Sequence, residues 1–379
     1  MKHDIVILGL SITSSWGNGH ATTYRSLVRE LHNLGHRVLF LERDVPWYAG
    51  NRDLPETDFA RIELYSGLEE LRHRHGDAIR EAELVMVGSY VPKGGDAGEY
   101  VLDTARGITA FYDIDTPVTL AKLRRGDCEY LRPELIPRYD LYLSFTGGPV
   151  LDHLEDDLGA PMARPLYCSV DPTLYFPGEN MLPVYDLGYM GTYSDDRQPA
   201  LNALLVDPAR HWPEGRFIVA GSRFPETFAW PTNIERIEHL PPAGHRRFYN
   251  TQRFTLNITR REMIEWGYSP SVRLFEAAAC GVPIISDYWE GIDTFFEIGK
   301  EILISRSSGE TFEYLTGISE TERLRIAANA RKRILDSHTA AYRAMELENY
   351  IWQAREKRKP NMKSVNFSGG MNLNKKYVL

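Results

Sequence analysis

The feature that most limits the possible folds of this chain is a regular alternation of short apolar runs with longer, helix-like segments. Each apolar run in the first half leads into a polar, turn-forming loop. Such an alternation is typical of parallel βαβ units, so we expect an α/β fold. The strands predicted in this half are Ile5–Leu10, Arg37–Leu41, Leu84–Gly88, Ile108–Tyr112, Leu141–Phe145 and Arg164–Cys168.

A second set of the same units follows Ser169–Asp186, a Pro-rich segment without periodicity that is typical of a linker. A helical pattern then runs from Thr321 to about Tyr350. The strands predicted in this half are Leu187–Met190, Arg216–Ala220, Ile237–Leu240, Phe254–Ile258, Val282–Ser286 and Ile302–Ile304. We therefore predict Rossmann-like domains at 1–170 and 187–335, a linker at 171–186, a helix at 336–358 and a disordered tail at 359–379.

The composition agrees with two ordinary globular domains, since the 379 residues are 43% hydrophobic and 25% charged. The three cysteines lie far apart and form no metal-binding or disulfide pattern, which favours a reducing compartment. No apolar run approaches the length of a membrane span or a signal core, so we expect a soluble, cytoplasmic protein. The net charge of −8 gives no strong sign of a nucleic-acid partner.

In open α/β sheets, ligands bind beyond the carboxyl ends of the strands, so the loops that follow the apolar runs are the candidate sites. The first is Ser11–His20, in which Gly17, Asn18 and Gly19 precede a helix start that could hold a phosphate or a sugar hydroxyl. This loop is not a GxGxxG fingerprint and Glu42 is a poor match for its acidic partner, which disfavours a nicotinamide cofactor. A plain turn is the alternative.

Three further loops carry polar groups. Asp113 and Asp115 follow the fourth predicted strand and could act as a base, hold a sugar hydroxyl or bind a metal, although Asp115 could equally cap the next helix. The other two loops place small residues and one arginine at strand ends, namely Gly191, Thr192, Gly221, Ser222 and Arg223.

The most informative loop lies within Asn257–Asp287. Pro270 and Ser271 open a helix that carries Arg273 and Glu276 three residues apart, on one face. Arg273 can therefore reach phosphates at the helix start while Glu276 accepts hydrogen bonds from a ribose diol. An ordinary intrahelical ion pair is the alternative.

The motif FEAAACGVPII resembles the EAxAxG helix of GT-B glycosyltransferases of the family 4 type. PSVRLFEAAACG, with YDIDTPVTL and DLGYMGTYSDDRQP upstream, resembles more closely the CgeB-like (spore maturation protein B type) glycosyltransferases, over about Ile5 to Tyr350. The resemblance implies two Rossmann-like domains facing across a cleft, with the helix at 336–358 crossing back to the first domain.

The resemblance also implies residue roles. Glu276 would bind ribose, Arg260 and Arg273 would neutralise the diphosphate, and the loop from Gly17 to His20 would meet the sugar. The family 4 pattern is Glu-x7-Glu, but the position eight residues before Glu276 is Tyr268. The expected donor-binding residues are Gly17, Asn18, Gly19, His20, Gly191, Thr192, Gly221, Ser222, Arg223, Tyr268, Ser269, Pro270, Ser271, Arg273 and Glu276.

We expect the chain to transfer a sugar from a nucleoside diphosphate, with a UDP-sugar favoured, to a hydroxyl or amine, with retention and without metal or cofactor. The expected catalytic residues are Asp113, Arg260 and Arg273, and the expected acceptor-binding residues are Trp16, Tyr90 and Asp115. The alternatives are a nucleotide-sugar epimerase, using Asp113, Glu265 or His20 as acid and base, and a non-catalytic sugar-binding scaffold.

Overall fold

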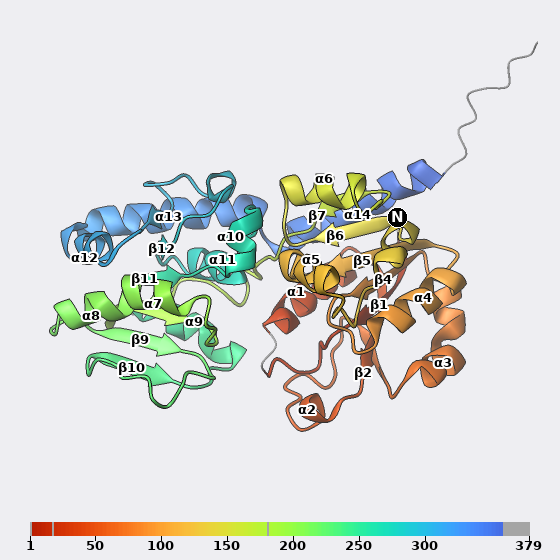
Figure 1. The fold of residues 1–379 in the computed structure, drawn as a ribbon, viewed down its shortest axis with the longest axis horizontal. Coiled ribbons are helices and arrows are strands. Elements are labelled where there is room, and N and C mark those ends of the chain that lie inside the picture. The colour runs from red at the N-terminus through yellow and green to blue at the C-terminus, as the bar shows by residue number, and fades with distance from the viewer. Residues whose placement is uncertain (1, 17–18, 180–181, 359–379) are drawn as a thin grey trace, which may run out of the picture.

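The computed structural model describes residues 2–16, 19–179 and 182–358, which form two α/β domains side by side (Figure 1). The first domain has a parallel sheet in the order β3-β2-β1-β4-β5-β6-β7, and the second has one in the order β10-β9-β8-β11-β12-β13. In both sheets the order reverses beside the first strand, the position where doubly wound sheets bind ligands.

The strands are β1 (Asp4–Gly9), β2 (Arg37–Arg43), β3 (Arg61–Tyr65), β4 (Leu84–Gly88), β5 (Ile108–Asp113), β6 (Leu141–Ser144), β7 (Ala163–Pro165), β8 (Tyr185–Met190), β9 (Phe217–Ala220), β10 (Ile234–Ile237), β11 (Gln252–Asn257), β12 (Ile284–Ser286) and β13 (Leu303–Ile304). The helices of the first domain are α1 (His20–Asn33), α2 (Pro46–Ala49), α3 (Leu68–Glu81), α4 (Gly94–Thr104), α5 (Thr116–Arg125), η1 (Pro133–Arg138) and α6 (Pro149–Asp156). Those that follow are α7 (Gln198–Leu201), η2 (Asn202–Val206), α8 (Asp207–His211), α9 (Pro242–Asn250), α10 (Arg261–Trp266), α11 (Val272–Ala279), η3 (Ile292–Thr294), α12 (Ser308–Gly317), α13 (Glu320–Ser337) and α14 (Ala340–Arg358).

The first sheet is buried on both faces because its strands alternate their apolar side chains between two layers of helices. Ile5 and Ile7 pack on the face covered by α1 and α14, whereas Val6 and Leu8 pack on the face covered by α3 to α6. This two-residue period explains why the strands read as continuous apolar runs.

The helical pattern predicted from Thr321 to about Tyr350 consists of two helices, α13 and α14, and α14 begins four residues after the start expected for the helix at 336–358. The chain crosses between the domains at His338 and Thr339, where the backbone of Val170 accepts from Ala340 and donates to His338. The Thr339 hydroxyl then caps α14 by accepting from the amide of Tyr342. The break between α13 and α14 lies where the chain crosses between the domains. Thr339, the residue that caps α14, is a helix-start signal in the sequence.

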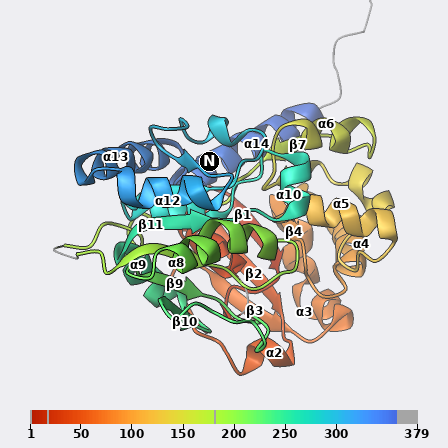
Figure 2. The same ribbon diagram turned by 60° about the vertical axis from the view of Figure 1, so that its left-hand side comes forward.

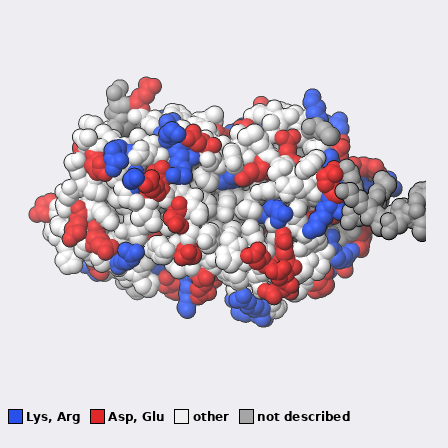
Figure 3. Space-filling view, turned by 90° about the horizontal axis from the view of Figure 1, so that it is seen from above, with Lys and Arg blue, Asp and Glu red and all other residues white. Residues whose placement is uncertain are grey.

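Helix α14 crosses back to the first domain, and Figure 2 shows α13 and α14 as consecutive segments along one side of the molecule. Its inner residues Ala344, Leu347 and Ile351 join the same core cluster as Leu27 and Leu31 of α1. Seen from this side, positive and negative side chains are interspersed over both domains (Figure 3).

Several predicted strands differ from those in the structure. No apolar run predicted the edge strand β3, whose side chains are mostly half-buried. Strand β10 begins three residues before its predicted position, and the pairing of β7 with β6 ends at Pro165, not at the predicted Cys168. Edge strands carry few buried side chains, so their apolar signal is weak.

The loop after β1 is held by a buried carboxylate at the end of β2. Glu42 is inaccessible to solvent, and it accepts from the amides of Ile12 and Thr13 and from the Thr13 hydroxyl at 2.8, 3.0 and 2.6 Å. The acid considered as a ribose ligand is therefore a support for the first candidate loop.

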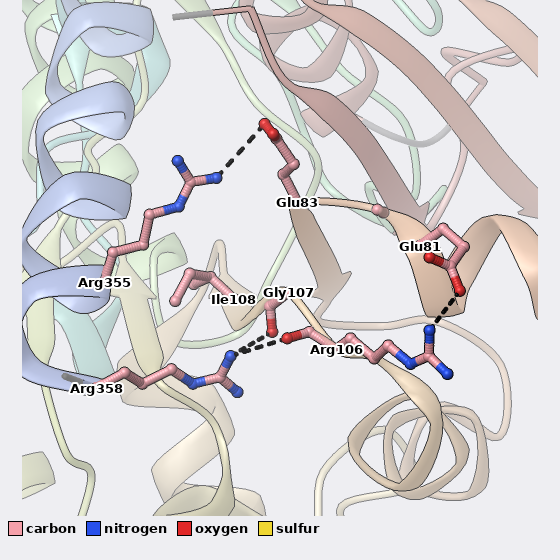
Figure 4. A pocket seen from close by; sticks show the side chains of 8 residues that line it. Glu81, Glu83, Arg106, Gly107, Ile108, Arg355 and Arg358 are labelled. Atoms are coloured by element: carbon pink, nitrogen blue, oxygen red, sulfur yellow. Dashed lines mark hydrogen bonds and ion pairs between the residues drawn. The ribbon is translucent and has the colours of Figure 1, made fainter. Parts of the chain in front are cut away.

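A cavity of about 300 Å³ lies where β4 and β5 begin, at the amino ends of the strands, whereas the candidate loops follow their carboxyl ends. Figure 4 shows that α14 closes one side of it. Arg358 donates to the carbonyls of Arg106 and Gly107, and Arg355 pairs with Glu83. These contacts fix the end of the crossover helix.

Replacing Glu42 by Ala should leave two buried amides and a hydroxyl without their acceptor and lower the stability of the first domain by about 3 kcal/mol. A thermal melt should then show a midpoint lower by roughly 5–10 °C. Glu42→Gln, which keeps one acceptor oxygen, should lose less, and Glu69→Ala, at a side chain 90% exposed, should change little. A melt of Glu42→Ala within 1 °C or so of the parent would contradict this support role.

Candidate functional site

The segments after β6 and β7 of the first domain lie against the loop that precedes α11 in the second. The amide of Gly147 donates to the carbonyl of Tyr268 at 3.0 Å, and the hydroxyls of Thr146 and Ser269 lie 2.8 Å apart. The Cys168 thiol donates to the carbonyl of Pro270. The predicted residues Ser269 and Pro270 are thus buried in the interdomain contact.

Helix α11 begins as predicted, with Ser271 in an extended conformation at its N-cap. The guanidinium of Arg273 donates to the carbonyls of Met190 and Ile258 at 2.6 and 3.1 Å, so it bridges the ends of β8 and β11. It lies directly over Gly191, where an added Cβ would come within 2.8 Å of its Nη1 atom. Gly191 therefore leaves the space that this cation occupies.

Glu276 is buried at 2% exposure in the same helix. Its carboxylate accepts from the Tyr249 hydroxyl at 2.9 Å and lies 3.9 Å from Nδ1 of His245. Tyr175, from the segment between the domains, is 3.3 Å from the same His245 nitrogen. A buried carboxylate edged by hydroxyl and imidazole groups suits a ligand with two hydroxyls.

Arg197 is a candidate that the sequence analysis did not select. It donates to the carbonyl of Thr192 and to the Ser194 hydroxyl, which holds it over the loop after β8. Burial lowers the pKa of Arg197, and the charges of Arg273 and Arg260 lower it further. Arg197 donates to the loop after β8, Arg273 bridges the ends of β8 and β11, and Arg260 follows β11. Three guanidinium-bearing residues thus lie at this end of the second sheet, an arrangement that favours an anion.

Arg197 could have been found from its place two residues before a Pro, at the start of α7. Asp195 and Asp196 have the sequence pattern of acids in a first helical turn, but they precede the helix. Asp196 accepts from the amide of Arg261, which ties the β8 loop to the start of α10. The helix begins later than its acids suggest, so Arg197 is the N-cap residue.

Arg260, at the N-cap of α10, reaches the first domain. Its Nη1 atom lies 3.9 Å from Oδ2 of Asp115, which Tyr90 also contacts, donating its hydroxyl at 2.9 Å. Nε2 of His20, in the first turn of α1, is 3.7 Å from the same oxygen, and its ring stacks on that of Tyr90. The structure thus brings together the predicted residues His20, Tyr90, Asp115 and Arg260.

The conformations and protonation of this cluster also distinguish it. Tyr90 has φ +64°, a strained value for a residue with a side chain, and such strain is concentrated at functional sites. Burial lowers the pKa of His20, the Asp115 carboxylate opposes that change and Arg260 adds to it. His20 is therefore neutral at pH 7, able to donate from one nitrogen and accept at the other.

Asp113 lies apart from this cluster. The strand period of two turns it to the face of Phe111, beneath α5, where it is inaccessible to solvent. It accepts from the hydroxyls of Tyr142 and Thr119 at 2.6 and 2.8 Å and from the amide of Asp115 at 3.2 Å. Of the two predicted carboxylates, Asp115 is the one that faces the second domain, and Asp113 supports the turn that presents it.

Tyr268, at the position of the first Glu of the family 4 pattern, packs its ring between the two domains. Its backbone has φ +48°, and its ring is held between Gly148 and Gly291. A Cβ added at either glycine would come within 2.3 Å of the ring. The ring therefore belongs to the interdomain contact.

The remaining predicted residues lie at the rims of the two domains. Gly221 packs against the carbonyl of Gly191, the Ser222 carbonyl accepts from the amide of Tyr193, and Arg223 is exposed with φ +67°. Gly19 precedes α1, and Trp16 is 47% exposed. Gly17 and Asn18 lie outside the described residues.

Among residues 2–16, 19–179 and 182–358, no group of three or more His, Cys, Asp and Glu side chains could hold a metal ion. None of the helices in these residues is long and apolar enough to cross a membrane.

Comparisons with known proteins agree with this geometry. Residues 197–349 match a family described as "Glycosyl transferase-like". No curated protein sequence matches the chain.

Three solved structures, each aligned over 93% of this chain and 100% of its own, share the fold. Sucrose-phosphate synthase from Thermosynechococcus elongatus is 12% identical with a TM-score of 0.67. HepE from Anabaena, solved with UDP-glucose, is 14% identical with a TM-score of 0.67. An alpha-glucosyltransferase solved with UDP and a 13-mer DNA is 13% identical with a TM-score of 0.69. The GT-B fold expected from the sequence, including its crossover helix, is confirmed.

The pKa of Asp113 gives a test of its supporting role. Burial raises this pKa from 3.8 to about 6 against the hydrogen bonds from Tyr142 and Thr119. The folded protein thus holds the proton more tightly, and the resulting stabilisation is complete below about pH 4 and lost as the pH rises through about 6. Asp113→Asn cannot titrate there, so the stability difference between parent and variant should shrink between about pH 4.5 and 7.5.

Urea unfolding of both proteins across this pH range measures the difference, in which the titration of all other groups cancels. A difference that stays constant or grows with pH would contradict the buried, proton-binding Asp113.

Proposed function

We propose that this chain is a glycosyltransferase that moves a sugar from a nucleoside diphosphate, with UDP favoured, to a hydroxyl or amine of an acceptor. The observation that carries the proposal is the group of Arg197, Arg260 and Arg273 beside buried Glu276, at the switch point of the second sheet and facing the first domain. The family match over residues 197–349 and the neighbours solved with UDP-sugars support it.

In this proposal the second domain binds the donor. Glu276 accepts from the ribose hydroxyls, with Tyr249 and His245 fixing its carboxylate. The three arginines hold the diphosphate and stabilise the charge that grows on it as the sugar leaves. Arg273 is already oriented by two carbonyl acceptors, so little reorganisation accompanies that charge.

The first domain would bind the acceptor. Asp115 and Tyr90 keep their predicted place there, and we add His20, whose neutral imidazole can accept or donate a hydrogen bond to the incoming hydroxyl. Trp16 would contribute an exposed aromatic surface at the rim. Asp113 takes a supporting part by holding the turn of Asp115.

Retention and independence of metal are part of the proposal. The arginines supply the positive charge that a metal ion would otherwise bring to the diphosphate. In a retaining transfer the leaving phosphate can take the acceptor proton, so no protein nucleophile is needed. The resemblance to family 4 and to CgeB-like enzymes supports this course, and membership of the CgeB-like subgroup is likewise proposed.

An epimerase is the less favoured reading because, of its three candidate acid and base residues, only His20 lies beside Asp115 and Arg260. Asp113 is buried with three donors, and Glu265 is an exposed partner of Arg261. A non-catalytic scaffold would bind donor but show no turnover.

Donor binding gives the first test. UDP should raise the melting temperature, because a ligand that binds only the folded state stabilises it. Arg273→Ala and Arg197→Ala should each weaken UDP binding about 10- to 100-fold, since each loses charged hydrogen bonds of about 1.5–3 kcal/mol. Isothermal titration measures the dissociation constants, with GDP, ADP and CDP in parallel.

Arg261→Ala is a matched control, because Arg261 is next to Arg260 in the chain but 78% exposed and paired with Glu265. Its UDP affinity should match that of the parent. Failure of the parent to bind every one of these nucleotides would count against the whole proposal.

The stereochemistry gives the second test. Slow hydrolysis of UDP-glucose, with water as acceptor, should release α-glucose first, because retention keeps the donor's configuration. Proton NMR during the first minutes distinguishes the anomers before mutarotation. Initial β-glucose would show inversion, and a UDP-sugar of changed configuration without transfer would support the epimerase.

A further inference from the structure

Arg260 has two possible ionic partners, the carboxylate of Asp115 and the diphosphate of a bound donor. It belongs to the second domain, at the end of the loop after β11, and its side chain is 41% exposed. Its ion pair, however, is with Asp115 of the first domain, at 3.9 Å. At that distance the pair is held by charge more than by a hydrogen bond.

Asp115 is the shared partner of three elements. Oδ2 accepts from the Tyr90 hydroxyl, and His20 and Arg260 lie 3.7 and 3.9 Å from the same oxygen. Its side chain is 15% exposed, so the carboxylate still borders solvent. Arg260 covers it from the side on which the second domain lies.

A nucleoside diphosphate would compete for Arg260. It brings at least two negative charges toward the arginine group, whereas Asp115 offers one, and attraction grows with the product of the charges. The charge of Arg260 also acts on Arg197, so the side chain lies within electrostatic reach of the other phosphate-binding candidates. The same guanidinium cannot serve both anions equally.

We propose that Arg260 is a switch between the two substrate sites, pairing with Asp115 in the donor-free protein and with the donor diphosphate once it binds. This rests on the proposed function. Release of Asp115 then completes the acceptor site, where the carboxylate takes the hydrogen bond of the acceptor hydroxyl beside His20 and Tyr90. The donor consequently binds before the acceptor.

The switch predicts changes in UDP affinity that can be measured without an acceptor. Asp115→Asn removes the competitor for Arg260 and should tighten UDP binding by about twofold to fivefold, as expected for a partly exposed ion pair. Arg260→Ala should weaken UDP binding about tenfold or more. In the Arg260→Ala background, Asp115→Asn should change nothing.

Isothermal titration of UDP into the four proteins, in low salt, provides this double-mutant cycle. Asp127→Asn is the matched control, since Asp127 is an exposed carboxylate just beyond the other end of α5, and it should bind UDP as the parent does. Circular dichroism checks that each variant is folded. The Asp115→Asn change removes no cap from α5, because the side chain of Asp115 makes no capping hydrogen bond to this helix.

Each outcome decides the question. Coupling between the two substitutions supports the switch. Equal tightening by Asp115→Asn in both backgrounds would reveal only a general electrostatic effect, and weaker binding would show that Asp115 helps to hold the donor; either result would overturn the switch and leave the transferase proposal intact. Absence of binding to the parent would overturn both.

Discussion

The two crossings of the chain between the domains hold each other, and the position of every group in the cleft depends on this contact. Val170 in the outgoing segment and Thr339 in the returning one form a parallel bridge. Beside it the buried guanidinium of Arg343 donates to the carbonyls of Tyr167 and Ser337 and to the carboxylate of Glu346. A buried cation is tolerated only where its donors are satisfied, so both crossings are tied to one side chain. The strand ends of the two sheets face each other because of it.

The fold could be predicted from the sequence more completely than the candidate site. Fully buried strands can be recognised in the sequence as apolar runs. The Pro-Ser start of α11, with Arg273 and Glu276, could be found from spacing alone. A local pattern, however, does not tell which face of a strand end a side chain takes. Asp113 and Asp115 look equivalent in sequence, but Asp113 is the last residue of β5 and is buried beneath α5, whereas Asp115 lies beyond the strand, in the turn before α5, and reaches Arg260 of the second domain.

Groups that depend on contacts across the cleft could not be predicted. Arg197 looks like one more charge in an acidic loop until the neighbouring arginines are in place. The contact between Arg260 and Asp115 joins positions 145 residues apart in the chain, and no spacing rule connects them. The site is thus a property of the domain arrangement, in which each half is incomplete without the other.

Tyr268 shows how such an arrangement restricts the residues that can occupy one position. Its ring fills the slot between Gly148 and Gly291, and its backbone lies in a conformation that few residues with side chains adopt. A glutamate placed at this position would inherit the same backbone and the same slot, and would leave a gap between two glycines. Gly148, Tyr268 and Gly291, on three separate loops, therefore form one packing unit between the domains, which a glutamate at position 268 would leave unfilled.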